Sequence, residues 1–90
     1  MNIYTYEKGE ARRFEFVIKN TENETIVVTS AFWTLTDRNK VVVSSGECSV
    51  DGCEISFVLP MTVRGELQLE LTVVIPPETI KERMMIRVVD

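Results

Sequence analysis

Histidine is absent from this chain of 90 residues, and only two cysteines, three prolines and four glycines are present. Without histidine, the chain lacks the side chain that most often acts as a general acid or base near neutral pH. Two thiols alone supply too few ligands for a zinc site. The glycines are scattered, so they form no phosphate-binding loop. The sequence therefore predicts a protein that is not an enzyme and that holds no metal and no cofactor.

Long apolar runs and an excess of positive charge are also missing. No stretch approaches the roughly 20 apolar residues of a membrane-spanning helix. The net charge of −4 disfavours binding to duplex nucleic acid. The start of the chain has neither the basic nor the apolar region of a secretory signal. We therefore expect synthesis in the cytoplasm and a partner that is not a nucleic acid, a membrane or a small-molecule substrate.

Length and composition predict one globular domain over residues 1–90. Hydrophobic residues make up 44% of the chain and charged residues 27%, which is typical of a folded protein. A chain of this length has room for a single core. Each side chain in that core therefore matters for stability.

The clearest local pattern is a hairpin over residues 66–89. Leucine, valine and isoleucine dominate alternate positions of 66–75, which is the period of a strand with one buried face. Residues 80–89 repeat this pattern, and Pro76–Thr79 must turn because proline cannot donate to a sheet ladder. The predicted hairpin pairs Ile75 with Ile80, Leu71 with Met84 and Leu69 with Ile86, and it places Glu70 diagonal to Arg83 and Arg87.

Further strands are predicted upstream, separated by polar or glycine-containing turns. They cover residues 2–7, 12–19, 25–36, 41–45, 48–50 and 53–59. The residues after Pro60 are also compatible with one turn of helix over Met61–Arg64. Apart from that turn, the sequence predicts strands throughout.

In the strand predicted over residues 25–36, the apolar positions that should face the core change from even-numbered to odd-numbered residues. Val28 belongs to one face of this strand and Trp33 to the other. A bulge near Thr29-Ser30 would bring both side chains to the core.

The two cysteines flank Asp51-Gly52, a dipeptide typical of a two-residue hairpin turn. In such a turn Val50 faces Cys53, and Cys48 lies diagonal to Cys53. Diagonal Cβ atoms are farther apart than a disulfide tolerates. We therefore expect two reduced, partly buried thiols that contribute packing.

The spacing of the strands indicates the fold class. Strands that recur every 8–12 residues with turns between them are typical of a sandwich or a barrel. Trp33, on the longest predicted strand, is large enough to fill the space between two sheets. The sharp corner at Arg64-Gly65 suits a chain that crosses between sheets. We therefore predict an all-β, immunoglobulin-like antiparallel β-sandwich of seven to eight strands.

The candidate partner-binding residues are Tyr4, Tyr6, Phe32, Val74 and Met85. The two tyrosines share one face of the first strand, where they suit an interface or cover the end of the core. Phe32 points outward if Trp33 points inward, and Val74 and Met85 also fall at outward positions. Together these last three would form an apolar patch on the outside of a sheet, a feature that often marks a partner contact. A buried Phe32 would remove this hypothesis.

Four segments carry a family resemblance. They are Tyr4–Arg13 (YTYEKGEARR), Ala31–Asp37 (AFWTLTD), Ser45–Gly52 (SGECSVDG) and Arg64–Glu70 (RGELQLE). The chain resembles short proteins of phages and prophages of Gram-positive bacteria, and is similar to the immunoglobulin-like N-terminal domains of phage baseplate upper proteins. It departs from that pattern by ending at Asp90 without a fibre or receptor-binding segment. Its Asp37–Lys40 turn also lacks the glycine that is usual there.

The resemblance implies a structural protein, without catalytic residues, that joins components of a tail, baseplate or virion. Its partner would be another protein or a second copy of the chain, bound through a sheet face or an edge strand, and its final location would be the virion. The alternative is a small intracellular regulator, such as a phage-encoded inhibitor of a host protein. A stable ring or trimer in solution would favour the structural role.

Overall fold

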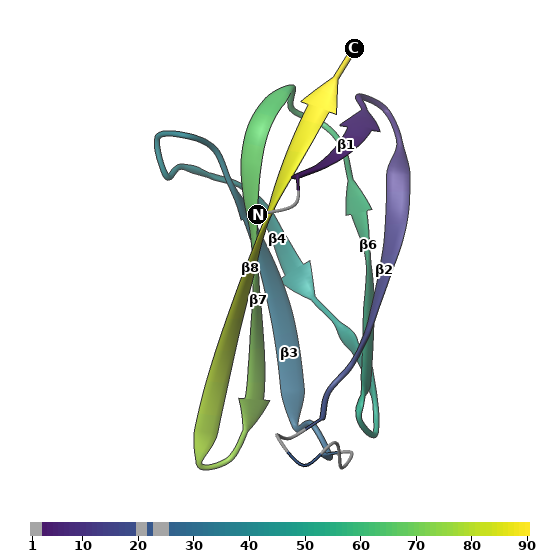
Figure 1. The fold of residues 1–90 in the computed structure, drawn as a ribbon, viewed down its shortest axis with the longest axis vertical. Coiled ribbons are helices and arrows are strands. Elements are labelled where there is room, and N and C mark those ends of the chain that lie inside the picture. The colour runs from purple at the N-terminus through teal and green to yellow at the C-terminus, as the bar shows by residue number, and fades with distance from the viewer. Residues whose placement is uncertain (1–2, 20–21, 23–25) are drawn as a thin grey trace.

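The computed structural model describes residues 3–19, 22 and 26–90, and these residues form two β-sheets that face each other (Figure 1). Their strands are β1 (Ile3–Glu7), β2 (Ala11–Val17), β3 (Ser30–Thr36), β4 (Val42–Glu47), β5 (Ser49–Asp51), β6 (Glu54–Pro60), β7 (Gly65–Ile75) and β8 (Glu78–Val89). Asn2 and Thr25, which begin two predicted strands, lie outside the described residues. The helical turn considered for Met61–Arg64 is wrong, because this segment is an irregular loop that buries Met61.

The five-stranded sheet has the order β1-β8-β7-β3-β4, and the three-stranded sheet has the order β2-β6-β5. All paired strands are antiparallel except β1 and β8, which are parallel. If β2, β6 and β5 are read as strands B, E and D, then β3, β7 and β8 are strands C, F and G of an immunoglobulin domain. The predicted all-β sandwich is therefore confirmed, with one parallel pair that the prediction did not include.

The core lies between the sheets and follows the alternation seen in the sequence. Strand β7 directs Leu67, Leu69, Leu71 and Val73 inward, and all four are buried. Strands β3, β6 and β8 add buried side chains at every second position. These are Ala31, Trp33, Leu35, Ile55, Phe57, Leu59, Ile86 and Val88.

Aromatic rings join the two sheets through Phe57 of β6. The Phe57 ring stacks on Phe14 at 5.4 Å, on Trp33 at 5.6 Å and on Phe16 at 6.2 Å between ring centroids. Tyr6 of β1 meets Phe14 edge-on at 6.0 Å. Because Trp33 and Tyr6 belong to the five-stranded sheet and the phenylalanines to the other, these contacts connect the two layers.

The β7–β8 hairpin has the predicted faces but a different register. Val73 pairs with Ile80, and Leu69 pairs with Met84. The predicted turn was four residues long, whereas the observed turn is Pro76-Pro77 alone, joined by a cis peptide bond. A turn shorter by two residues moves every pair by two positions and leaves each side chain on its predicted face.

The β5–β6 hairpin also differs from the predicted register, although its turn keeps the predicted length of two residues. Val50 pairs with Ile55 rather than with Cys53. The turn residues are Gly52 and Cys53, and Gly52 has a φ of 64°. A positive φ at the first turn residue suits the hairpin turn that favours glycine at that position. Both cysteines remain free, and both are partly exposed.

The segment before β3 is a crossing between sheets and not a bulged strand. The Val28 N–H donates to the Gly52 carbonyl (2.9 Å), beside the three-stranded sheet, and the Thr29 N–H donates to Val74 (3.0 Å) of the other sheet. Val28 and Ala31 are both buried, as the parity argument required. The prediction of a bulge near Thr29-Ser30 is therefore wrong. The chain passes from one sheet to the other here, and this passage explains why the inward positions change from even-numbered to odd-numbered residues.

The turn between β3 and β4 is held by Asp37. Its Oδ1 atom accepts hydrogen bonds from the N–H groups of Asn39 (2.9 Å) and Val41 (3.0 Å). The Lys40 N–H donates to the Asp37 carbonyl at 3.0 Å. Lys40 has a φ of 63°, a left-handed conformation that disfavours residues with a Cβ atom.

Replacing Lys40 by glycine is expected to raise the free energy of unfolding by about 0.5–1 kcal/mol, because glycine adopts this conformation without steric cost. Urea denaturation followed by circular dichroism measures the change. Asn39→Gly is the matched control, and it should destabilise the fold slightly, since Asn39 has no positive φ. Equal effects of both substitutions would contradict the prediction.

Candidate partner-binding surfaces

Phe32 lies on the outer face of the five-stranded sheet and is 43% exposed, as predicted. It pairs with Thr72 of β7, and Val74 is two residues farther along that strand. Diagonal neighbours on adjacent strands are within reach of an aromatic ring. The structure therefore brings Phe32 and Val74 together, although Val74 is itself only partly exposed.

Met85 lies apart from these two residues. It pairs with Gln68, four residues along β7 from Thr72, the partner of Phe32, which separates the two positions by about 13 Å along the strand direction alone. Between them, Glu70 forms ion pairs with Arg83 (2.8 Å) and Lys81 (3.7 Å). The expected patch of three apolar side chains is therefore wrong, because a row of charge crosses the face.

The charged row continues toward the other end of the same face. Glu66 lies opposite Arg87 and pairs with it at 3.0 Å, while Glu70 lies opposite Arg83. The predicted diagonal placement of Glu70 is wrong, since the register differs by two residues. Exposed ion pairs of this kind contribute about 0–1 kcal/mol each to stability.

The two tyrosines of β1 point toward β2 and not away from the sandwich. Tyr6 is partly buried against Phe14, and the Arg12 guanidinium lies 5.7 Å above its ring. Tyr6 therefore covers one end of the core, which was one of the two expectations. Tyr4 is 48% exposed and borders a cavity of about 300 Å³ with Phe16. Its exposed ring leaves an interface role open to test.

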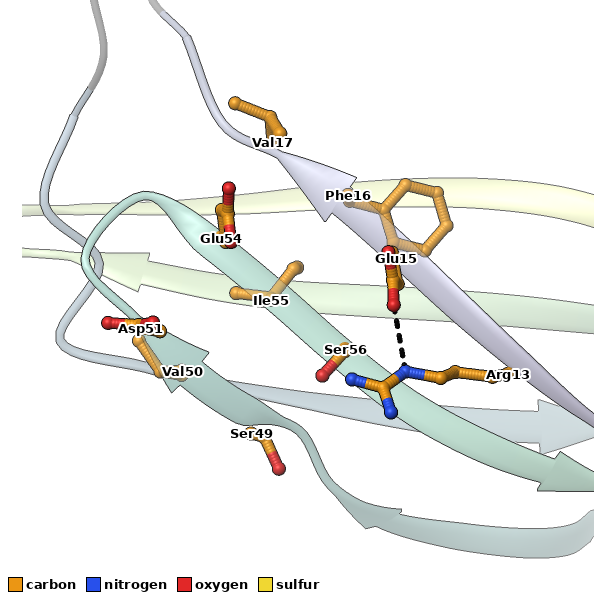
Figure 2. A pocket seen from close by; sticks show the side chains of 10 residues that line it. All are labelled: Arg13, Glu15, Phe16, Val17, Ser49, Val50, Asp51, Glu54, Ile55 and Ser56. Carbon is orange, nitrogen blue, oxygen red and sulfur yellow. Dashed lines mark ion pairs between the residues drawn. The ribbon is translucent and has the colours of Figure 1, made fainter.

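A depression of about 480 Å³ lies against the three-stranded sheet (Figure 2). Its rim includes the Arg13–Glu15 ion pair (2.8 Å) of β2, and Asp51 and Glu54 face each other across β5 and β6. In the part of the chain that the structure describes, no three side chains of the types that bind metals are grouped closely enough to hold an ion. The depression is open and polar, so its form does not indicate a small-molecule site.

Two potential nucleophiles lie in β4 and directly after it. The Ser44 Oγ atom is buried and has no hydrogen-bond partner within the described residues, so no base contacts it. Cys48 follows β4, and its N–H donates to the Ala31 carbonyl at 2.9 Å. Burial raises the pKa of the Cys48 thiol to about 11, which disfavours the reactive thiolate. Neither group has the surroundings of an activated nucleophile.

Cys48 is expected to react with iodoacetamide at pH 8 at least tenfold more slowly in the folded protein than in urea, because its raised pKa leaves little thiolate. The same shift predicts that the contribution of this thiol to stability is present below pH 9 and is lost as the pH rises toward 11. A Cys53→Ser variant isolates the reaction, and mass spectrometry measures it. Equal rates in both states would contradict the prediction.

An apolar cavity that was not anticipated lies between β2 and β8. Its volume is about 400 Å³, and its lining includes Leu71, Val73, Ile80 and Met84. The alternation of apolar residues in the sequence predicted that these side chains face inward. It did not indicate that some of them line a cavity at the side of the sandwich. The cavity lies beside the part of β8 that the described residues of β1 do not pair with, which is a matter of tertiary structure.

Among the described residues, no helix is long and apolar enough to cross a membrane. No protein-family model matches this chain, and no curated protein matches it.

Proposed function

We propose that this domain is a non-enzymatic interaction module of a phage or prophage tail or virion assembly. In this role it binds a protein partner through a sheet face or an edge strand. The observation that carries the proposal is the set of apolar side chains exposed along its sheet edges. These are Ile3 and Tyr4 on β1, Val17 on β2, Val42 at the start of β4 and Val41 directly before it.

Edge strands with exposed apolar side chains favour pairing with another chain. Monomeric proteins usually protect such edges with charge, proline or a covering loop. Val41 and Val42 are each 57% exposed, and Val42 begins an edge strand of the five-stranded sheet. The surface thus supports a role in assembly, with Phe32 of the adjacent strand as a second apolar contact.

The phage assignment is supported by the four resembling segments. Ala31–Asp37 and Arg64–Glu70 supply strands β3 and β7, and Ser45–Gly52 contains the passage from β4 to β5. These segments specify the sandwich and its turns. The assembly role itself is inferred from the resemblance together with the exposed edges.

Mass spectrometry of particles purified from the phage-producing strain tests the proposal. We expect the chain in fixed stoichiometry with the tail proteins, and antibody labelling at the tail in electron micrographs. Its absence from the particles, together with a one-to-one complex with a host protein, would contradict the proposal and favour the regulator. Light scattering after size-exclusion chromatography adds the oligomeric state, since a stable ring or trimer favours assembly.

A further inference from the structure

In the part of the chain that the structure describes, one half of the outer edge of β8 has no strand beside it. Over its described residues, which begin at Ile3, β1 pairs with Met85–Val89 of β8 (Figure 1). On its other side β8 is paired with β7 along Glu78–Val88. Within residues 3–19, 22 and 26–90, nothing pairs with the outer edge of Glu78–Met84. The backbone groups of this half-strand are therefore available to an additional strand.

The apolar cavity between β2 and β8 opens beside this bare edge. Buried Leu71 and Val73 contribute to its lining, and the partly buried side chains of Phe16, Ile80 and Met84 surround them. Added strands in protein complexes are held in this way, with main-chain hydrogen bonds along an edge and alternate side chains in apolar pockets.

The three-stranded sheet leaves an edge free at the same cavity. In constant-type immunoglobulin sandwiches strand A pairs with strand B in that sheet. Here β2 occupies the position of strand B, and in the described part of the chain it pairs with β6 alone. β1 belongs to the opposite sheet. The cavity thus lies between two strand edges, one from each sheet.

The charge on the bare edge indicates the chemistry of an occupant. Glu82 pairs with the inward-facing Leu71, so it belongs to the inward row between Ile80 and Met84. Among the described residues it has no ion-pair partner, whereas its neighbours Lys81 and Arg83 both pair with Glu70. A strand laid along this edge would therefore be stabilised by a basic side chain opposite Glu82.

A second copy of this chain is a poor occupant. Antiparallel pairing of two β8 edges with matching faces, centred on Ile80, Lys81 or Glu82, places Glu82 against Glu78, Lys81 against Lys81 or Glu82 against Glu82. Like charges directly opposite each other are destabilising. A strand with a basic residue two positions from an apolar residue on each side would be complementary. In this chain only Met85–Val89 has that pattern, and it is already paired on both sides.

We propose that the cavity between β2 and β8 binds an extended segment of another protein, added to β8 in line with β1. The segment carries an apolar residue, then a lysine or arginine two positions later, and an apolar residue two positions after that. The apolar side chains enter the cavity beside Ile80 and Met84, and the basic side chain pairs with Glu82. This inference rests on the proposed role as a protein-binding module and specifies one edge for it.

A pair of synthetic seven-residue peptides tests the inference. In both peptides, threonine alternates with the three residues that would face the cavity. These three residues are valine, lysine and valine in one peptide, and valine, glutamate and valine in the other. In a titration of the labelled domain followed by NMR, we expect amide shifts confined to Glu78–Met84 and to Phe16–Lys19. The lysine peptide should bind at least fivefold more tightly than the glutamate peptide.

Reversing the charge on the protein completes the test. Glu82→Lys should invert the preference of the two peptides, while Glu47→Lys, the same change on the opposite edge strand, should leave it unaltered. Equal affinities, an unchanged preference in Glu82→Lys, or shifts located elsewhere would overturn the inference. Circular dichroism verifies that each variant is folded.

Weak binding of short peptides calls for a second measurement. Each peptide is fused ahead of residue 1 through a flexible glycine–serine linker, which gives it a high effective concentration. The lysine fusion should raise the Tm by about 2 °C or more over the glutamate fusion, and Glu82→Lys should reverse the order. Fusions with equal Tm values overturn the inference. The chain could still be present in phage particles, so this failure is distinguishable from failure of the assembly role.

Discussion

Replacing Phe57 by alanine is expected to lower the free energy of unfolding by about 3–5 kcal/mol. The Phe57 ring is 6% exposed and stacks on rings from both sheets, with Trp33 on one side and Phe14 and Phe16 on the other. Its removal leaves a cavity at the centre of the aromatic contacts that join the layers. Because small domains have total stabilities of about 5–15 kcal/mol, this loss is a large share of the whole.

The neighbouring residue supplies the control for Phe57→Ala. Val58 follows in the same strand but is 55% exposed, so Val58→Ala should change the free energy of unfolding by about 0.5 kcal/mol or less. Urea denaturation followed by circular dichroism measures both variants, since the fluorescence of Trp33 responds directly to the loss of the stacked ring. A similar cost at the two positions would refute the central role of Phe57.

Replacing Gly46 by alanine and then by valine is expected to destabilise the fold in two steps, by about 1 kcal/mol and about 3 kcal/mol. Gly46 of β4 pairs with Trp33 of β3, and the indole lies across the glycine. A Cβ atom built on Gly46 would come within 3.0 Å of the Trp33 Cζ2 and Nε1 atoms. The indole would have to move, and its stacking on Phe57 limits that movement.

Two further variants separate a steric clash from a general effect on β4. Ser45→Val places the same bulk on the exposed neighbour of Gly46, and it should alter stability by about 0.5 kcal/mol or less. In a Trp33→Phe background Gly46→Ala should cost less, because phenylalanine lacks the indole atoms that meet the new methyl group. If Gly46→Ala lowers the free energy of unfolding as much in the Trp33→Phe background as in the native sequence, a clash with the indole is not the cause.

Much of the local structure was predictable from the sequence, because the period of two fixes which face each side chain occupies. The alternation of 66–75 identified Leu67 and Leu69 as core residues. In the strand predicted over 25–36, an inward Trp33 placed Phe32 on the outside. Both assignments are confirmed. The turn at Asp37–Lys40 was also recognised, since a short polar segment between two apolar strands can do little else.

The candidate site was less predictable, because proximity on a face depends on register as well as parity. A shift of two residues keeps every side chain on its face but changes its neighbours. The shorter turn at Pro76-Pro77 placed Glu70 directly opposite Arg83, and that ion pair separates Phe32 from Met85. No local pattern distinguishes a two-residue turn from a four-residue turn when both leave the strands equally amphipathic.

The sequence by itself determined that this protein is built from strands, which of their faces are buried, and where the chain turns. Those properties depend on neighbours along the chain, whose alternation and turn chemistry act over a few residues. The tertiary structure decided that residues 26–29 cross between sheets and that β1 lies parallel to one half of β8. It also opened the cavity beside Ile80 and Met84. These outcomes depend on contacts between residues far apart in sequence, and local patterning does not specify them.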